Sequence, residues 1–429
     1  MVDQLLNEVY EYYLNSNGVS IDTRTVEEGE IFFAIEGDNF DGNEYAMLAL
    51  EKGAAKVVVS SSSIDHFNAI KVDDTLVFLQ KLAKHHRNES KMTLLALTGS
   101  NGKTTTKELI AQVLKKQYRI DFTKGNLNNH LGVPLTLLNF RKDLDIGIVE
   151  MGSNHVGEIE DLSRIASPNY GLITNIGKAH IGEFGGQENI LIAKTELYRN
   201  IISNSGVIFC NRKDPVLPRQ LEGYENTVFF DSRFQGGVKS VVDEYEPQIV
   251  LTVDSEGREY SATLNIGGRH NFMNVQSAIA IGLYFGITPK EIVDQLQTFQ
   301  APDNRSQWIK TERNKVFLDA YNANPDSVSA AIEYFIELDI PRKLIIVGDM
   351  RELGEYSLIE HQNIFDRLKK SNIPFYLVGE EFSSAVNDDR VFLSKEDLLE
   401  HVNLGDVKDT SVLVKASRGI KLESLLSDF

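Results

Sequence analysis

The sequence predicts an α/β protein of three domains built around mainly parallel sheets. Near-continuous apolar runs alternate with helical patterns along most of the chain, as is typical of parallel strands that helices cover on both faces. At 429 residues the chain is also too long for one ordinary hydrophobic core. We therefore expect a small N-terminal α/β domain, a central domain and a C-terminal α/β domain.

The N-terminal domain is expected to span residues 1–88. Short apolar runs predict its strands at Glu30–Ile35, Ala55–Val59 and Leu76–Phe78. A helical pattern over Leu79–Asn88 then leads toward the next apolar run. We place the first domain boundary at the end of this helix.

The central domain is expected to span residues 89–302, around a mainly parallel sheet. Its predicted strands are Met92–Leu97, Asp145–Glu150, Tyr170–Ile176 and Gly206–Cys210. Strict alternation over Thr252–Ile266 instead predicts an antiparallel hairpin. Two helices with apolar faces follow, at Asn274–Phe285 and Ile287–Phe299. Thr288, which precedes Pro289, is expected to cap the second helix.

The C-terminal domain is expected to span residues 303–429 and to be Rossmann-like, because the alternation of strands and helices restarts there. Its predicted strands are Val316–Ala320, Lys343–Val347, Phe375–Val378 and Val412–Val414. Helical patterns cover Ser327–Ile336 and Leu358–Lys369.

Charge and cysteine content narrow the class of protein. The formal net charge of −18 argues against general binding to nucleic acid or anionic membranes, because both need a basic face. The single cysteine, Cys210, lies in an apolar run and can form no disulfide within the chain. The N-terminus resembles no signal peptide, and no apolar stretch approaches membrane-spanning length, so we expect a cytoplasmic protein without membrane insertion.

The segment Thr98-Gly-Ser-Asn-Gly-Lys-Thr-Thr-Thr106 predicts a nucleotide phosphate site between a strand and a helix. Its glycines allow backbone N–H groups to approach phosphate oxygens, and the helix N-terminus adds partial positive charge. Lys103 can reach a terminal phosphate, and the Thr104 hydroxyl can ligate Mg²⁺. Leu97 stands where the general motif has its first glycine, so the match is to a shorter form. A glycine-rich turn that binds nothing is the weaker alternative.

Further polar clusters follow the predicted strands, at the edge where ligands of open α/β sheets bind. Glu150 ends a strand and can ligate Mg²⁺, unless it is an incidental acid. The loop Gly125–Pro134 can donate amide hydrogens to phosphate, although taken alone it fits a turn-rich connector better. For His180 a metal ligand and a structural histidine are both open. Lys194 and Glu196 do not share a helix face, so the residues alone predict two solvated side chains.

Taken together, these residues resemble the Mur ligase family of ATP-dependent amide-forming enzymes, which build the bacterial peptidoglycan precursor. The segment Thr98–Thr106 is similar to the family's phosphate loop. The resemblance implies that Glu150 and His180 bind metal and that Lys194 is carbamylated, so that it acts as a carboxylate. It implies two Mg²⁺ ions, one held by Thr104 and Glu150 and the other by His180 and the carbamate.

The resemblance implies roles for a larger set of residues. Those expected to bind ATP are Gly99, Ser100, Asn101, Gly102, Lys103, Thr104, Thr105, Asn129, His270, Asn271, Asn274, Arg305 and Asp319. Those expected to bind the other substrates are Thr23, Arg24, Asp41, Tyr321, Asn322, Asn324, Asp349, Glu352, Lys415, Ser417 and Arg418. Those expected to act in catalysis are Lys103, Glu150, His180, Lys194 and Arg305.

Two segments of the last domain, Tyr321–Pro325 and Gly348–Gly354, resemble one branch of the family. This resemblance implies a monomer that adds D-alanyl-D-alanine to UDP-N-acetylmuramoyl-tripeptide through an acyl phosphate. Thr23 and Asn43 depart from that branch, where serine and histidine are usual. The alternatives are a sibling ligase that adds a single amino acid, to the nucleotide peptide or to a folate, and a nucleotide-switched binding protein without ligase chemistry.

Overall fold

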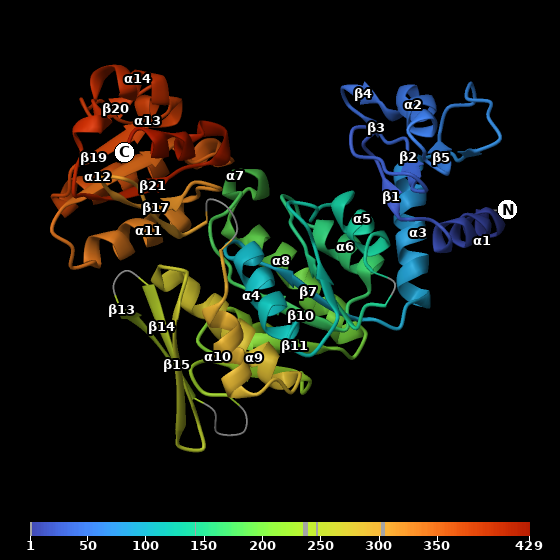
Figure 1. The fold of residues 1–429 in the computed structure, drawn as a ribbon, viewed down its shortest axis with the longest axis horizontal. Coiled ribbons are helices and arrows are strands. Elements are labelled where there is room, and N and C mark those ends of the chain that lie inside the picture. Colours follow the sequence, from blue (N-terminus) through green and yellow to red (C-terminus); the bar gives the residue numbers. More distant parts are fainter. Residues whose placement is uncertain (1, 142, 235–238, 246–247, 302–304) are drawn as a thin grey trace.

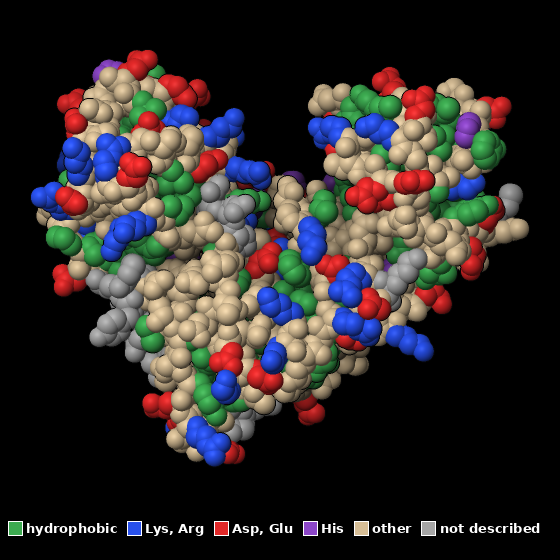
Figure 2. Space-filling model, viewed as in Figure 1, with side chains coloured by type: hydrophobic (Ala, Val, Ile, Leu, Met, Phe, Trp, Pro, Cys, Tyr) green, Lys and Arg blue, Asp and Glu red, His purple; other side chains and the backbone are tan. Residues whose placement is uncertain are grey.

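The computed structural model describes the chain except for residues 1, 142, 235–238, 246–247 and 302–304 (Figure 1). The N-terminal and C-terminal domains stand as two arms on the central domain, and the space-filling view shows a hollow between them (Figure 2). Among the described residues, no helix is both long and apolar enough to span a membrane.

The N-terminal domain is a four-stranded parallel sheet in the order β1-β2-β5-β6. Its strands are β1 (Val19–Ser20), β2 (Ile31–Phe33), β5 (Lys56–Val59) and β6 (Ala69–Lys71). A short hairpin, β3 (Glu36–Gly37) and β4 (Phe40–Asp41), follows β2. The helices are α1 (Val2–Leu14), α2 (Ala46–Glu51) and α3 (Thr75–Glu89). The strands predicted around β2 and β5 are confirmed.

The strand predicted at Leu76–Phe78 is wrong, because these residues form the first turn of α3. The Asp74 side chain caps this helix by accepting a hydrogen bond of 2.8 Å from the Val77 N–H. The apolar run continues at helical spacing: Phe78 and Leu82 both face the core. A run of three apolar residues fits either element, and the cap decides in favour of the helix. The expected boundary at residue 88 falls in the last turn of this helix.

The central domain contains a six-stranded parallel sheet in the order β12-β11-β10-β7-β9-β8. Its strands are β7 (Thr93–Thr98), β8 (Ile120–Phe122), β9 (Ile146–Glu150), β10 (Tyr170–Ile173), β11 (Val207–Asn211) and β12 (Thr227–Phe230). Leu95 and Leu97 pack under α4 (Lys103–Leu114), α9 (Phe272–Tyr284) and α10 (Pro289–Gln297). Leu94 and Ala96 face α5 (Gly132–Leu138), α6 (Glu158–Ala166) and α8 (Gln187–Ser203). The predicted parallel sheet with both faces covered is confirmed.

A three-stranded antiparallel sheet extends the central domain beside α10. It consists of β13 (Lys239–Tyr245), β14 (Gln248–Ser255) and β15 (Arg258–Leu264). The last two strands confirm the predicted hairpin. Thr288 caps α10 in a capping box with Glu291, as predicted. Cys210 lies on β11 and is fully buried.

The C-terminal domain has a six-stranded sheet in the order β16-β17-β21-β18-β19-β20, parallel except for β16. Its strands are β16 (Gln307–Lys310), β17 (Lys315–Asp319), β18 (Lys343–Gly348), β19 (Phe375–Val378), β20 (Val391–Phe392) and β21 (Ser411–Lys415). Its helices are α11 (Pro325–Glu337), α12 (Ser357–Ser371), α13 (Glu380–Ala385) and α14 (Lys395–His401). All four predicted strands and both predicted helices are present. The boundary expected between residues 302 and 303 lies outside the described residues.

Candidate active site at the strand ends

The segment Thr98–Thr106 forms the turn between β7 and α4, and two of its glycines are required by the backbone. Gly99 has a φ of +144° and Gly102 a φ of +78°, which other residues rarely adopt. A Cβ at Gly99 would clash with Thr174 Oγ1, and one at Gly102 would lie 2.6 Å from Asn274 Oδ1. Neighbouring loops thus approach this turn closely enough to exclude any side chain.

The residues that follow β10 hold this phosphate loop by hydrogen bonds. The Asn101 carbonyl accepts a hydrogen bond of 2.6 Å from Thr174 Oγ1, and the Asn101 N–H donates one of 3.0 Å to Asn175 Oδ1. The Gly177 N–H donates to Ser100 Oγ at 2.8 Å. The predicted strand Tyr170–Ile176 stops at Ile173 because the next residues make these loop contacts instead.

Lys103 opens α4 and interacts electrostatically with the end of β9 and with two residues of the C-terminal domain. Its Nζ donates a hydrogen bond of 2.7 Å to the Gly99 carbonyl. Burial lowers the pKa of Lys103, the Glu150 and Glu352 carboxylates raise it, and the Arg305 guanidinium lowers it. Arg305 and Glu352 belong to the C-terminal domain, so that domain contributes charge to the phosphate loop.

Glu150 ends β9 with its carboxylate buried, 2% exposed. Its Oε1 accepts a hydrogen bond of 2.9 Å from Asn128 Nδ2, and its Oε2 lies 3.6 Å from Lys107 Nζ. Among the described residues, Oε2 has no hydrogen-bond partner. A buried carboxylate oxygen with free lone pairs suits a hard cation such as Mg²⁺. Asn129, the neighbour that the sequence indicated, is exposed and instead accepts a hydrogen bond of 2.8 Å from the Gly132 N–H.

Lys194 and Glu196 lie on α8 and are both buried, so the expectation of two solvated side chains is wrong. The helix packs against both α6 and the sheet, so no side of it is solvated around Lys194 and Glu196. Lys194 Nζ donates to Ser153 Oγ at 2.8 Å, and Glu196 accepts hydrogen bonds from two N–H groups at the start of α6. Burial lowers the pKa of Lys194 well below its ordinary value, and the charge of Lys103 lowers it further.

His180 lies after β10 with a φ of +57° and faces the C-terminal domain. Its Nδ1 is 2.8 Å from Glu352 Oε2 and 3.2 Å from Glu183 Oε2. The ligand atoms of these three residues lie within 4.8 Å of one another, a grouping that can hold a metal ion. The hydrogen bond from His180 is the main reason why the pKa of Glu352 is lowered.

Three more residues expected to bind ATP, His270, Asn271 and Asn274, lie at the start of α9, next to the phosphate-loop helix α4. Asn274 Oδ1 accepts a hydrogen bond of 3.0 Å from Thr106 Oγ1, and Asn274 Nδ2 donates one of 2.9 Å to Asn271 Oδ1. Both asparagines are buried. His270 is exposed, with Nε2 3.0 Å from Ser306 Oγ at the start of the C-terminal domain.

In the C-terminal domain, the expected residues gather at the ends of three parallel strands. Buried Lys415 has its Nζ 3.0 Å from Asp319 Oδ2 and donates to the Asn322 carbonyl. The guanidinium of Arg305 lies 3.6 Å from the centre of the Tyr321 ring, and that of Arg418 lies 5.5 Å from it. This edge therefore presents cations around an aromatic ring.

Three more predicted residues at this edge differ in what their side chains contact. Asn324 Nδ2 donates a hydrogen bond of 2.7 Å to Asn101 Oδ1 and so reaches the phosphate loop directly. The Asp349 carboxylate accepts from two N–H groups at the start of α13, each at 3.0 Å, and is turned toward its own domain. The Ser417 hydroxyl is buried and has no hydrogen-bond partner among the described residues.

The residues predicted to bind substrate in the N-terminal domain lie on the other arm. Arg24 pairs with Asp22 at 2.6 Å, and the Thr23 carbonyl accepts a hydrogen bond of 2.6 Å from Lys52 Nζ. Asp41 accepts a hydrogen bond of 2.8 Å from Asn43 Nδ2. Their elements stand apart from the phosphate loop, on the far side of the hollow (Figure 1).

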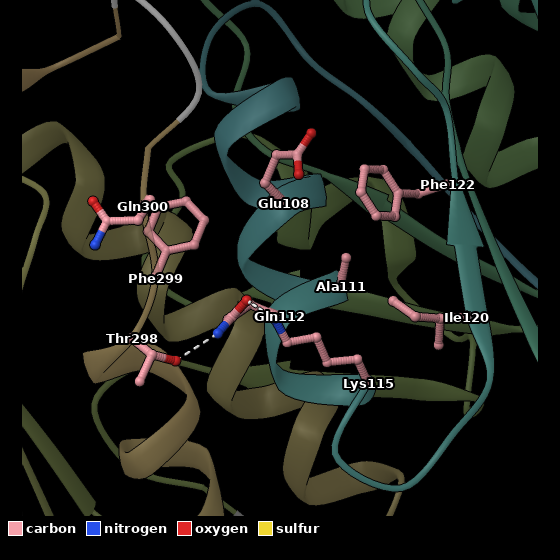
Figure 3. Close-up of a pocket in the computed structure, with 9 residues that line it drawn as sticks. All are labelled: Glu108, Ala111, Gln112, Lys115, Ile120, Phe122, Thr298, Phe299 and Gln300. Carbon is pink, nitrogen blue, oxygen red and sulfur yellow. Dashed lines mark hydrogen bonds between the residues drawn. The ribbon is translucent and has the colours of Figure 1, made fainter.

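A surface pocket elsewhere on the central domain contains none of the expected ATP residues. Figure 3 shows it along the flank of α4, where Gln112 Nε2 donates to Thr298 Oγ1 at 2.7 Å. It is lined by Glu108, Ala111, Gln112, Lys115, Ile120, Phe122, Thr298, Phe299 and Gln300.

Known proteins match the chain throughout. Residues 15–87 match the Mur ligase family catalytic domain, residues 97–282 the Mur ligase middle domain, and residues 304–418 the Mur ligase glutamate ligase domain. A UDP-N-acetylmuramoyl-tripeptide–D-alanyl-D-alanine ligase of Bacillus subtilis (strain 168) is 36% identical over 99% of this chain and 95% of its own length. The chain belongs to the Mur ligase family.

Solved structures of Mur ligases share this fold over nearly the whole chain. A MurF structure from Acinetobacter baumannii has a TM-score of 0.85 and 30% identity, covering 96% of this chain and 92% of that one. MurF ligase from Thermotoga maritima in complex with ADP has a TM-score of 0.83 and 27% identity, covering 97% of each chain. The predicted family and α/β fold class are thereby confirmed, and with them the class of ATP-dependent ligases.

Proposed function

We propose that this protein is an ATP-dependent ligase that joins D-alanyl-D-alanine to UDP-N-acetylmuramoyl-tripeptide in the cytoplasm. The observation that carries this proposal is the hydrogen bond of 2.7 Å between Asn324 and Asn101. It joins the phosphate loop to the Tyr321–Pro325 segment, one of the two segments that resemble the branch of the family that adds D-alanyl-D-alanine to UDP-N-acetylmuramoyl-tripeptide. The near full-length similarity to a UDP-N-acetylmuramoyl-tripeptide–D-alanyl-D-alanine ligase supports the same reaction.

The chemistry requires ATP because an amine does not condense with a carboxylate in water. An oxygen of the peptide's terminal carboxylate attacks the γ-phosphorus, the bond to ADP breaks, and an acyl phosphate forms. The D-alanyl-D-alanine amine then attacks the acyl carbon, phosphate leaves, and the amine loses a proton. Both steps depend on positioning and on balancing negative charge.

Lys103 and Arg305 are the cations that we place at the transferring phosphoryl group. Their charges already interact, since Arg305 lowers the pKa of Lys103. Fixed cations at this point stabilise charge that develops in the transition state. The protein carries a net charge of −18, so these local cations oppose its overall repulsion of anionic substrates.

The residues expected to hold Mg²⁺ fit a hard cation. Glu150 offers a buried oxygen that has no hydrogen-bond partner in the described part of the chain, and Thr104 offers a hydroxyl at the start of α4. We assign one ion to this pair and a second to His180 and Lys194. Bound Mg²⁺ neutralises phosphate and carboxylate charge, so that the two anions can approach each other.

We further propose that Lys194 is carbamylated. Carbamate formation requires the neutral amine, which attacks CO₂ and releases a proton. Burial favours that neutral form, because it lowers the pKa of Lys194 well below the ordinary value. The Ser153 hydroxyl, 2.8 Å from Nζ, can instead donate a hydrogen bond to the carbamate oxygen.

Substrate roles on the two arms complete the proposal. We place D-alanyl-D-alanine near Tyr321, Ser417 and Arg418. The buried Ser417 hydroxyl, which has no partner among the residues that the structure describes, and the Arg418 guanidinium suit a carboxylate. We place the uridine nucleotide on the N-terminal domain, near Arg24 and Asp41. Contact between the C-terminal domain and the phosphate loop then excludes water from the acyl phosphate.

A substrate panel with phosphate release as the readout tests this function. Release is expected only when ATP, the UDP-muramoyl tripeptide and D-alanyl-D-alanine are all present, with a pentapeptide product seen by mass spectrometry. Single D-alanine, glutamate or a folate should not replace the dipeptide. Product formation with one of these would favour a sibling ligase, and release indifferent to both co-substrates would indicate a nucleotide switch.

A further inference from the structure

The segment between β10 and α8 contains a lysine to which neither the phosphate chemistry nor the family resemblance gives a role. Lys178 lies in the central domain, but its contacts are with the C-terminal domain. Its backbone N–H donates a hydrogen bond of 2.5 Å to Asp326 Oδ2, in the first turn of α11. Its Nζ donates one of 2.7 Å to Glu360 Oε1 on α12. One residue thus binds two helices of the neighbouring domain.

The pair with Glu360 is better shielded than an ordinary surface ion pair. The Glu360 side chain is 10% exposed and that of Lys178 is 38% exposed. A carboxylate this buried loses much of its hydration, so its partner cation compensates a larger cost than at an open surface. Removing Lys178 would leave Glu360 shielded without that ion-pair partner, which disfavours the docked arrangement.

The backbone on both sides of Lys178 fits tightly against the same domain. A Cβ at Gly177 would clash with Asp326 Oδ2, and a Cβ at Gly182 would lie 2.5 Å from the Leu353 carbonyl carbon. The short helix α7 (Ile181–Phe184) follows, and its apolar side chains join the core cluster of the C-terminal domain. Lys178 therefore lies in a docking segment rather than in a mobile surface loop.

The same segment also holds the phosphate loop. Gly177 exchanges two hydrogen bonds with Ser100: its N–H donates to Ser100 Oγ at 2.8 Å, and its carbonyl accepts from that hydroxyl at 3.2 Å. Lys178 directly follows Gly177 in the chain. A displacement of the C-terminal domain at Asp326 or Glu360 would therefore act one residue away from the hydrogen bonds that hold the phosphate loop.

We infer that Lys178 is a positioning residue, which holds the C-terminal domain where Arg305 and Glu352 act on Lys103. This inference rests on the proposed ligase function, for which those charges matter. The hydrogen-bond partners of Lys178, Asp326 and Glu360, are not among the residues expected to bind metal, ATP or the other substrates. The pairs Asn324–Asn101, His180–Glu352 and His270–Ser306 also cross this junction, and each contains an expected site residue. Lys178 therefore allows docking to be tested apart from the chemistry.

The variant Lys178→Met tests the inference with two independent readouts. Small-angle X-ray scattering of the full-length protein should show a larger radius of gyration, because the ratio of docked to undocked molecules falls about tenfold. In the phosphate-release assay, kcat should fall in step with the docked fraction, about threefold if most molecules are docked in the wild type, whereas KM for ATP should change less than twofold, since the phosphate loop is intact. Lys290→Met is the matched control, because it removes an exposed pair of 2.6 Å with Asp294 within α10 and should change neither readout.

Charge reversal separates docking from general damage to the fold. Lys178→Glu and Glu360→Lys should each increase the radius of gyration, and the double variant should restore it toward the wild-type value. An unchanged radius in Lys178→Met, or a double variant no better than the single ones, would overturn the inference. The scattering experiment needs no ligase activity, so failure of the proposed function would appear separately, as wild-type protein that does not release phosphate.

Discussion

The two arms of the molecule join the central domain in different ways, although both are α/β units built on parallel sheets. The N-terminal arm shares its hydrophobic core with the central sheet: Val9 and Phe78 belong to the same buried cluster as Leu94 and Ala96. Arg87, at the end of α3, is buried and donates hydrogen bonds to the Ala166 carbonyl at 2.9 Å and to Asn169 Oδ1 at 2.8 Å.

The C-terminal arm instead docks on loops of the central domain: the segment between β10 and α8, the phosphate loop and the turn that holds His270. Its polar contacts include the ion pairs His180–Glu352 and Lys178–Glu360. Among the described residues, only four buried apolar side chains of the central domain join its core: Ile181, Phe184, Ile190 and Ala193. Ion pairs that are partly open to water separate at a smaller cost than a shared core does. The difference indicates that the N-terminal arm is fixed to the central domain. The C-terminal arm, which lies next to the phosphate loop, can separate from it.

The largest effect on activity is expected from Lys194→Ala. Lys194 lies next to α7, the short helix that packs into the C-terminal arm. Lys194 Nζ lies 5.3 Å from the centre of the Phe184 ring on α7. Loss of a metal-binding carbamate should lower phosphate release about a thousandfold, with partial recovery in added short carboxylic acids. Full activity without additives would contradict the carbamate role, and exposed Lys290→Ala serves as the control.

Arg87→Met is expected to break the fixed side of the comparison. It removes the Arg87 donor from the buried Ala166 carbonyl and leaves Asn169 Oδ1 with the Leu94 N–H alone, at a cost of about 2 kcal/mol in the free energy of unfolding. Urea denaturation measures this loss. Arg164→Met, on the exposed face of α6, should cost less than about 0.5 kcal/mol. Equal losses for both variants would show that Arg87 does not anchor this arm.

Gly182→Ala is expected to act on the separable side without unfolding the protein. The added Cβ would lie 2.5 Å from the Leu353 carbonyl carbon, so the C-terminal arm must shift outward. We expect kcat to fall about tenfold, with a change of less than about 1 kcal/mol in stability. Gly405→Ala is the control, because its nearest neighbour is an asparagine side-chain tip at 3.1 Å. Wild-type kcat in Gly182→Ala would mean that this close contact does not govern docking.

The smallest effect concerns pH. Burial keeps the Lys194 amine neutral in the folded protein at pH values just below its ordinary pKa of 10.5. Unfolding exposes this amine, which then takes up a proton. The free energy of unfolding therefore rises with pH in this range. Lys194→Met should make that slope shallower by about 1 kcal/mol per pH unit, in CO₂-free buffer where the amine is not carbamylated. Identical slopes for both proteins would show that the amine stays charged.

Sequence patterns predicted the long buried strands well, because an apolar run such as that of β7 fits few structures besides a buried strand. Short or edge strands such as β13 and β16 carry no comparable run and were missed. The run at Leu76–Phe78 fits a strand or a helix equally, and only its capping residue Asp74 decides. Local sequence patterns therefore predict the central strands of each sheet better than its short and edge strands.

The candidate site shows where single-sequence reasoning stops. Lys107 is fully buried beside Glu150, yet a lysine in a helical pattern is normally solvated, so no local signal indicates it. Asn128 hydrogen-bonds to Glu150, whereas the neighbouring Asn129 was the residue predicted to bind ATP. Consecutive side chains of a loop point in different directions, so a shift of one residue changes the partner. Lys178 was missed because its partners lie far away in the chain.

Burial of Cys210 has a practical consequence for measuring the two arms. Its thiol is fully buried, and burial raises its pKa to about 12, so it stays protonated and unreactive toward alkylating dyes at neutral pH. The natural protein thus behaves as a thiol-free background. A cysteine at Phe67, which is 84% exposed on the N-terminal arm, and another at Leu393, 61% exposed on the C-terminal arm, could carry a fluorescent donor and acceptor. Energy transfer between them would report the opening of the hollow one molecule at a time.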